Sequence, residues 1–242
     1  MNAIEINGLT KRYKDVLAVD DLSLTVREGE LFALLGVNGA GKTTTIKMLS
    51  TLTAPDGGDA FLLGKSIREA ASEIKSFIAL SPQETAIARG LSVRENLELM
   101  CGIHGFDRER RDQKIKEVSD LLGLNEVITR KSGKLSGGWQ RRLSIAMALI
   151  SEPKILFLDE PTLGLDVIAR SDLWDLIRAF KGKVTIILTT HYMEEAEALS
   201  DRIAIMKDGR LIACDTASTL KDSVGAATFE EAFIRIVKGE NA

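Results

Sequence analysis

A glycine-rich segment near the N-terminus has the residue types and the spacing of a phosphate-binding loop. Residues 36–43 read GVNGAGKT and match G-x-x-x-x-G-K-[ST] in full. Glycines permit the backbone angles that turn successive N–H groups inward around an anion, and a following helix adds its positive end. Lys42 would then reach the β- and γ-phosphates of a nucleotide, and Thr43 would bind Mg2+.

Two acidic residues that could complete this chemistry follow an apolar run. Residues 155–158 read ILFL and are followed by Asp159 and Glu160. An acid at the tip of a buried strand is costly unless it meets a cation, so Asp159 is expected to hold Mg2+, directly or through water. Glu160 is the natural candidate to polarise an attacking water. An acidic turn without function is the alternative, and a phosphate loop in the same chain makes it the weaker one.

A third segment could bind an anion or could simply begin a helix. Ser136, Gly137 and Gly138 precede a helix whose apolar residues recur at helical spacing. Exposed N–H groups at such a start are equally suited to an ordinary serine N-cap and to a second anion site. The spacing alone leaves both interpretations open.

The elements that must position these residues indicate an α/β fold. The first thirty residues alternate and turn like antiparallel strands, whereas residues 31–35 form an apolar strand that leads through the glycine-rich loop into a helix from 42 to about 52. Strands near 155–158 and 184–188, separated by a helix near 172–180, predict a mostly parallel sheet covered on both faces.

The predicted domain organisation is a nucleotide-binding core with a helical insertion. Ser92 and Glu95 form a capping box before a helical pattern, so residues 84–135 are expected to be an inserted α-helical subdomain. Residues 1–83 and 136–220 would make the core, with an N-terminal antiparallel β subdomain, and 221–242 a short C-terminal helix.

Composition excludes several classes of protein. The formal net charge of -3 argues against a nucleic-acid partner, because such proteins concentrate Lys and Arg. No apolar stretch approaches the roughly 20 residues needed to cross a bilayer, and the N-terminus has no secretory pattern. Cys101 and Cys214 are too few and too far apart for a disulfide framework or a zinc site. A soluble chain in the cytosol is therefore expected.

Along nearly its whole length the chain resembles an ATP-binding cassette (ABC) ATPase. Besides the phosphate loop and the acidic pair, residues 81–83 resemble the glutamine loop of that family, LSGGWQ at 135–140 its signature, and 164–166 the loop that crosses between subunits. His191 resembles the switch histidine, and Tyr13, with Val19, the aromatic position that stacks on adenine. The chain departs from the family at Val37, usually proline, and at Trp139, and neither position supplies a side chain to the chemistry.

The resemblance implies an ATPase in which two chains, two copies or homologous subunits, sandwich two ATP molecules head to tail, with Mg2+ as cofactor. The catalytic residues would be Glu160, His191 and Lys42. The Mg2+ ligands would be Thr43, Gln83 and Asp159. The nucleotide contacts would be Tyr13, Val19, Gly36, Val37, Asn38, Gly39, Ala40, Gly41, Lys42, Thr43, Thr44, Gln83, Ser136, Gly137, Gly138 and Asp166.

Three functions compete within this resemblance: a transporter subunit, a cassette protein acting on nucleic acid or ribosomes, and a nucleotide-binding module without turnover. The chain lacks the coiled-coil insertion or second cassette of the nucleic-acid and ribosomal proteins, and it retains Glu160 and His191. A transporter subunit is therefore expected, bound peripherally at the cytoplasmic face of the membrane to a separate integral membrane permease. Residues 91–99, 190–197 and 229–233 resemble the drug- and sodium-export branch.

Overall fold

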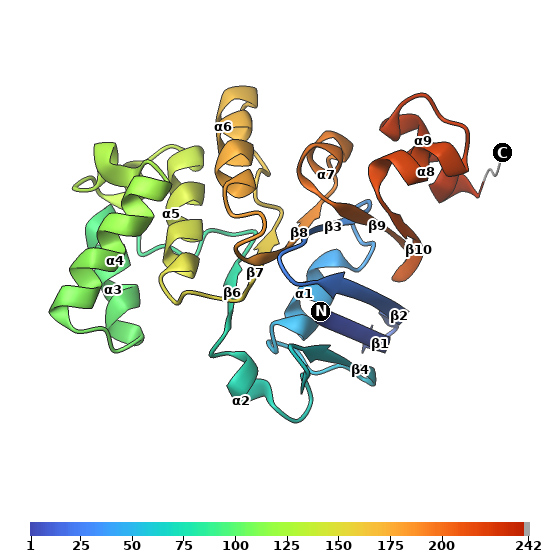
Figure 1. The fold of residues 1–242 in the computed structure, drawn as a ribbon, viewed down its shortest axis with the longest axis horizontal. Coiled ribbons are helices and arrows are strands. Elements are labelled where there is room, and N and C mark those ends of the chain that lie inside the picture. The colour runs from blue at the N-terminus through green and yellow to red at the C-terminus, as the bar shows by residue number, and fades with distance from the viewer. Residues whose placement is uncertain (240–242) are drawn as a thin grey trace. The chain divides into compact units, whose positions relative to one another are not determined.

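A computed structural model describes residues 1–239 of the chain, which forms two compact units (Figure 1). The first unit comprises residues 1–75 and the chain from residue 181 onward. The second comprises residues 76–180.

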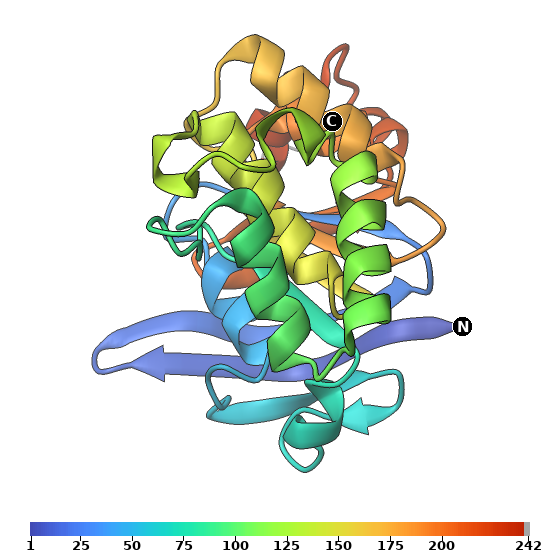
Figure 2. The same cartoon turned by 90° about the vertical axis from the view of Figure 1, so that its left-hand side faces the viewer.

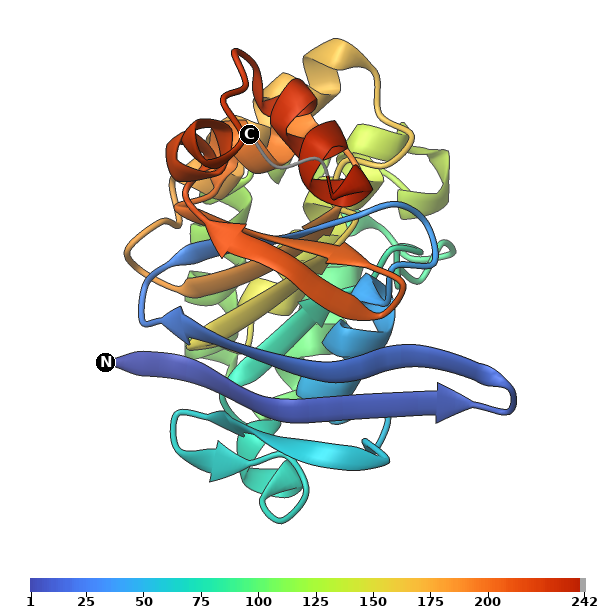
Figure 3. The same cartoon turned by 90° about the vertical axis from the view of Figure 1, so that its right-hand side faces the viewer.

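The first unit contains a four-stranded antiparallel sheet in the order β2-β1-β4-β5. Figure 3 shows the long β1–β2 pair with β4 beside β1. The antiparallel strands predicted for the first thirty residues are confirmed, whereas β4 and β5 were not predicted. The four strands are β1 (Asn2–Tyr13), β2 (Val16–Arg27), β4 (Gly57–Leu62) and β5 (Lys65–Ser66).

A second sheet of this unit carries the phosphate loop. Its strands lie in the order β10-β9-β3-β8, with β3 parallel to both of its neighbours and β10 antiparallel to β9. Every residue of β3 and β8 is buried, which explains why both read as apolar runs rather than alternating strands. These strands are β3 (Leu31–Leu35), β8 (Thr185–Thr190), β9 (Arg202–Lys207) and β10 (Arg210–Asp215).

Five helices of the first unit lie in the described chain. They are α1 (Lys42–Leu49), α2 (Ala71–Ile74), α7 (Met193–Leu199), α8 (Ala217–Ser223) and α9 (Phe229–Lys238). The predicted C-terminal helix, 221–242, falls on the end of α8 and on α9, and residues 240–242 lie outside the described residues. Among the helices described in either unit, none is long and apolar enough to cross a membrane.

The second unit combines a parallel strand pair with four helices, which are drawn in green to orange in Figure 2. Its strands are β6 (Ile78–Ser81) and β7 (Ile155–Asp159). Its helices are α3 (Val93–Ile103), α4 (Arg108–Leu121), α5 (Gly137–Leu149) and α6 (Val167–Arg178), and 3-10 turns lie at Leu124–Val127 and Ser132–Lys134. Helices α3 and α4 lie in the predicted insertion, whose limits at 84 and 135 stay a prediction.

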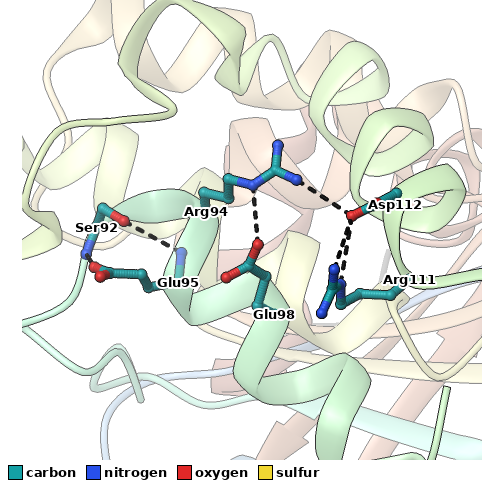
Figure 4. A network of polar contacts seen from close by, with 6 residues as sticks. All are labelled: Ser92, Arg94, Glu95, Glu98, Arg111 and Asp112. Carbon is teal, nitrogen blue, oxygen red and sulfur yellow. Dashed lines mark hydrogen bonds and ion pairs between the residues drawn. The ribbon is translucent and has the colours of Figure 1, made fainter. Parts of the chain in front are cut away.

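The capping box predicted at the start of α3 is confirmed (Figure 4). The Ser92 hydroxyl accepts from the Glu95 N–H at 3.2 Å, and the Ser92 N–H donates to the Glu95 carboxylate at 2.6 Å. The bond from the Ser92 N–H, and secondarily the Ser92 side chain, hold the pKa of Glu95 below its ordinary value. Arg94 extends the network by pairing with Glu98 on α3 and with Asp112 on α4, so the Arg94–Asp112 ion pair joins the two helices.

Candidate functional site

The glycine-rich loop between β3 and α1 needs two of its glycines for different reasons. Gly41, the residue before α1, has φ 99°, a left-handed conformation that disfavours a side chain. A Cβ there would also overlap the carbonyl oxygen of Ala18. Gly36 has an ordinary φ, but a Cβ on it would lie 2.5 Å from the Met206 carbonyl oxygen. The loop is therefore held against β2 and β9 as well as shaped by its own backbone.

The loop encloses the ammonium group of Lys42. This side chain is buried, and its Nζ donates to the carbonyl oxygens of Gly36 at 2.8 Å and Val37 at 3.3 Å. Val37, Asn38 and Gly39 are exposed, whereas Thr43 and Thr44 are half-buried in the first turn of α1. A cation held inside a ring of backbone groups at a helix start is the arrangement that receives phosphate oxygens.

The predicted switch histidine lies beside the beginning of this loop. His191 directly follows β8, which pairs with β3 in parallel so that Thr190 is opposite Leu35. The Gly36 N–H donates to the Thr190 carbonyl oxygen at 3.3 Å. The His191 ring packs against Tyr192 with 4.1 Å between ring centroids. The first unit thus brings together His191 and the phosphate loop, as expected at the carboxyl edge of a parallel sheet.

The two predicted adenine contacts differ in exposure. Tyr13 ends β1 and is 43% exposed, with the Lys11 ammonium 5.4 Å from its ring centroid. Val19 is fully buried, and its Cγ2 lies 3.4 Å from the position of a Cβ on Gly41. Val19 therefore supports the phosphate loop from beneath, whereas Tyr13 lies at the end of the β1–β2 hairpin.

In the second unit the acidic pair lies at the end of β7, as predicted. Asp159 and Glu160 are both buried, and Glu160 is 6% exposed. Its backbone has φ 48°, a left-handed conformation that costs a non-glycine residue about 1–2 kcal/mol. Strain of this kind persists where the surrounding structure enforces it, and it is concentrated at functional sites.

A buried arginine that the sequence analysis missed holds the glutamine loop. Arg141 of α5 is 5% exposed and donates to the carbonyl oxygens of Pro82 and Gln83, at 2.7 Å each, while the Gln83 side chain is exposed. Arg141 is three and seven residues from the buried Ser144 and Ala148 on one helix face. A buried guanidinium requires hydrogen-bond acceptors, so an arginine on the apolar face of a predicted helix was the signal that could have indicated this contact.

The start of α5 answers one of the questions that the sequence leaves open. Ser136 occupies the N-cap position, but its side chain makes no capping hydrogen bond, unlike the N-cap residues of α3, α4, α6, α8 and α9. Ser136 is therefore an N-cap residue by position, without the side-chain hydrogen bond of an ordinary serine cap. Asp166, by contrast, caps α6 by accepting from the Ala169 N–H at 2.9 Å.

The predicted ligands of Mg2+ divide between the two units. Thr43 lies in the first unit, and Gln83 and Asp159 in the second. All three offer hydroxyl, amide or carboxylate oxygen atoms, the donors that suit this hard cation. Among the described residues, no group of three or more His, Cys, Asp or Glu side chains is placed to bind a metal ion.

An α/β fold in which a buried strand, a glycine-rich loop around a lysine and a helix follow one another defines a P-loop nucleotide hydrolase. The family model described as "ABC transporter" matches residues 19–163. The chain belongs to the ABC transporter family, as an ATP-binding subunit with the ATPase fold predicted from the sequence. The predicted ATPase activity agrees with this membership.

Several named relatives are similar to this chain. The daunorubicin/doxorubicin resistance ATP-binding protein of Streptomyces peucetius is 42% identical over 93% of this chain, which spans 68% of that protein. The probable multidrug ABC transporter ATP-binding protein YbhF of Escherichia coli is 38% identical over 97% of this chain, and the phospholipid-transporting ATPase ABCA3 of Homo sapiens is 42% identical over 92%. The chain spans only 41% and 13% of those two proteins.

Two solved structures share its fold along most of the chain. The structure of an ATP binding subunit of an ABC transporter superposes with a TM-score of 0.85 at 26% identity, covering 97% of this chain and 99% of that one. A dimeric ATP-binding cassette in a post-hydrolysis state, bound to ADP and Pi, gives a TM-score of 0.79 at 25% identity, covering 88% of this chain and 98% of that one.

Proposed function

We propose that this subunit hydrolyses ATP in a head-to-tail dimer and thereby powers export through a separate membrane permease. One observation carries the proposal: the chain presents two different anion-binding arrangements, the loop around Lys42 and the uncapped start of α5 at Ser136. One nucleotide needs only one phosphate loop, so the second arrangement is best explained by the nucleotide of a partner copy.

The start of α5 has the properties of a half-site for such a nucleotide. The N–H groups of Ser136, Gly137 and Gly138 lie at the positive end of a helix of thirteen residues, and the Ser136 hydroxyl is not used as a cap. In a twofold pair each copy would offer this segment to the phosphate loop of the other.

In the proposed reaction Glu160 orients and polarises the attacking water. Lys42 would stabilise the charge on the γ-phosphate, and His191 would contact the same group from the end of β8. Bound Mg2+, held by Thr43, Gln83 and Asp159, would neutralise charge on the β- and γ-phosphates. The left-handed backbone of Glu160 supports its role, because backbone strain of this kind is concentrated at functional sites.

The proposal of export rests on the relatives, whose names describe drug resistance, multidrug and phospholipid transport. Two of the three names state transport and the third states drug resistance, and the compounds that they name differ. We therefore assign cargo recognition to an integral membrane permease and place this subunit on the cytoplasmic face of that partner.

Replacing Glu160 by Gln tests both the chemistry and the dimer. Loss of a general base should lower kcat by about 100- to 10,000-fold while the phosphate loop stays intact. The variant should then accumulate as an ATP-bound dimer, measured by size-exclusion chromatography with light scattering. Glu126→Gln, at a glutamate exposed in the 3-10 turn after α4, is the matched control and should behave like the parent protein.

Two results would contradict the proposal. Unchanged ATP turnover by the Glu160 variant would show that Glu160 does not act on the attacking water. A Glu160 variant that binds ATP and stays monomeric at every protein concentration would contradict the proposed dimer.

A further inference from the structure

Three side chains join helices α5 and α6 within the second unit. The Arg142 guanidinium of α5 donates to the Asp172 carboxylate of α6 at 2.9 Å. The same guanidinium lies over the ring of Trp139, 4.9 Å from the ring centroid. We call Trp139, Arg142 and Asp172 the α5–α6 brace.

The two helices run side by side in the same direction (Figure 1). A Cβ on Gly138 would lie 3.3 Å from the Cβ of Ala169, and one on Gly137 would lie 3.6 Å from the Leu165 side chain. One turn further along both helices, the Arg142–Asp172 ion pair repeats the contact. The starts of α5 and α6 are therefore neighbours, and so are the residues that lie there.

Those starts carry the two segments predicted to face a second copy. Ser136, Gly137 and Gly138 begin α5, and Asp166 caps α6. Gly138 has no side chain and Ala169 only a methyl group, so their contact brings the two helices close without a polar bond between them. The α5–α6 brace lies one helical turn further from these starts, and it supplies a polar link between the helices that the small residues cannot form.

Trp139 has a specific part in the brace. Arg142 is on the same helix three residues later, so the indole face lies directly beside its guanidinium. The Arg142 side chain is only 17% exposed, whereas that of Asp172 is 55% exposed. The ring limits the directions in which the guanidinium can point and so aims it at α6. Trp139 also stands where the signature departs from its family.

We propose that Trp139 is a positioning residue, which acts through Arg142 and Asp172 to hold the start of α5 and Asp166 in the geometry that a second copy engages. This inference rests on the proposed head-to-tail dimer. The phosphate loop belongs to the other unit and contributes no residue to the brace, so loading of ATP should be unaffected when the brace is cut.

The test compares four single variants in steady-state ATP hydrolysis across protein concentration. Trp139→Leu keeps an apolar side chain without the ring, Trp139→Phe keeps a ring, and Asp172→Asn removes the charge of Asp172. Asp175→Asn is the matched control, because Asp175 forms an ion pair with Arg178 within α6 rather than with α5. Binding of a fluorescent ATP analogue to dilute protein and the melting temperature are measured in parallel.

The inference predicts a split between turnover and binding. Trp139→Leu and Asp172→Asn should lower kcat, or raise the protein concentration that gives half-maximal activity, by about two- to fivefold. Trp139→Phe should retain most of the activity, and Asp175→Asn all of it. Affinity for the ATP analogue and melting temperature should stay at the parent values.

Other results would overturn the inference. Parent-like turnover in both Trp139→Leu and Asp172→Asn would show that the brace positions nothing used in catalysis. An equal loss in Asp175→Asn, or a loss of ATP-analogue affinity together with turnover, would indicate general damage to the unit. Failure of the proposed function would give a different result, because the parent protein itself would then lack ATP turnover or ATP-driven dimerisation.

Discussion

At the scale of single residues, two separate constraints act on the glycines of the phosphate loop: the backbone conformation and the space around the Cα atom. Gly39 and Gly41 both have left-handed backbones, with φ 85° and 99°. Among the described residues no atom lies within 4 Å of a Cβ placed on Gly39, whereas a Cβ on Gly41 meets the backbone of β2. Glycine is therefore favoured by a left-handed backbone at Gly39, and by a left-handed backbone together with crowding at Gly41.

Substituting each of these glycines by alanine should separate the two constraints. Gly39→Ala should lower the free energy of unfolding by about 1–2 kcal/mol, the cost of a left-handed non-glycine residue. Gly41→Ala should lower it by roughly a further 1–3 kcal/mol, because a buried backbone must move, and should weaken ATP binding as α1 shifts. Urea unfolding and ATP titration measure both effects, and equal losses in the two variants would contradict the account.

At the scale of elements, local signals were predictable and distant ones were not. The helix start at Ser92 and the strand at 31–35 were predicted because their causes, a cap and a buried apolar run, lie within a few residues. The contacts of Arg141 and the α5–α6 brace were missed because the partners lie 58 and 30 residues away in the chain. Strands β9 and β10 pair with each other through a two-residue turn at Asp208 and Gly209, so this hairpin had a local signal that the sequence analysis overlooked. Strands β4, β5 and β6 were also not predicted.

The start of α3 gives a prediction about pH. Hydrogen bonds lower the folded-state pKa of Glu95 below 4.5, so its ionised form stabilises the fold above that pH, and this contribution disappears as the pH falls through the lowered pKa. Glu95→Gln can keep the capping bond but cannot titrate. Its free energy of unfolding should therefore fall less than that of the parent protein between about pH 6 and about pH 3.

Urea unfolding at several pH values measures this difference. Glu126→Gln is the control, since it lies outside the capping box. Parallel profiles for the parent protein and Glu95→Gln would show that the carboxylate of Glu95 adds no stability of its own.

At the scale of the whole molecule, the proposed dimer divides each active site between two copies. One copy would supply Lys42, Glu160 and His191, and the other would supply the start of α5 and Asp166. The motifs made most of these residues predictable, because each is a short segment with local causes. Their division between the half-sites of a dimer came from the family resemblance, because no spacing within one chain encodes a contact with another copy.

The central claim is that one active site takes its phosphate loop from one copy and the start of α5 from another. Two inactive variants test it directly: Lys42→Ala disables the loop, and Ser136→Arg blocks the start of α5 at an exposed residue whose side chain caps nothing. In a mixed dimer one site combines both defects and the other contains neither. Mixing the two inactive variants should therefore restore ATP hydrolysis, measured at protein concentrations where the specific activity of the parent protein no longer rises. A mixture no more active than its separate components would contradict the shared site.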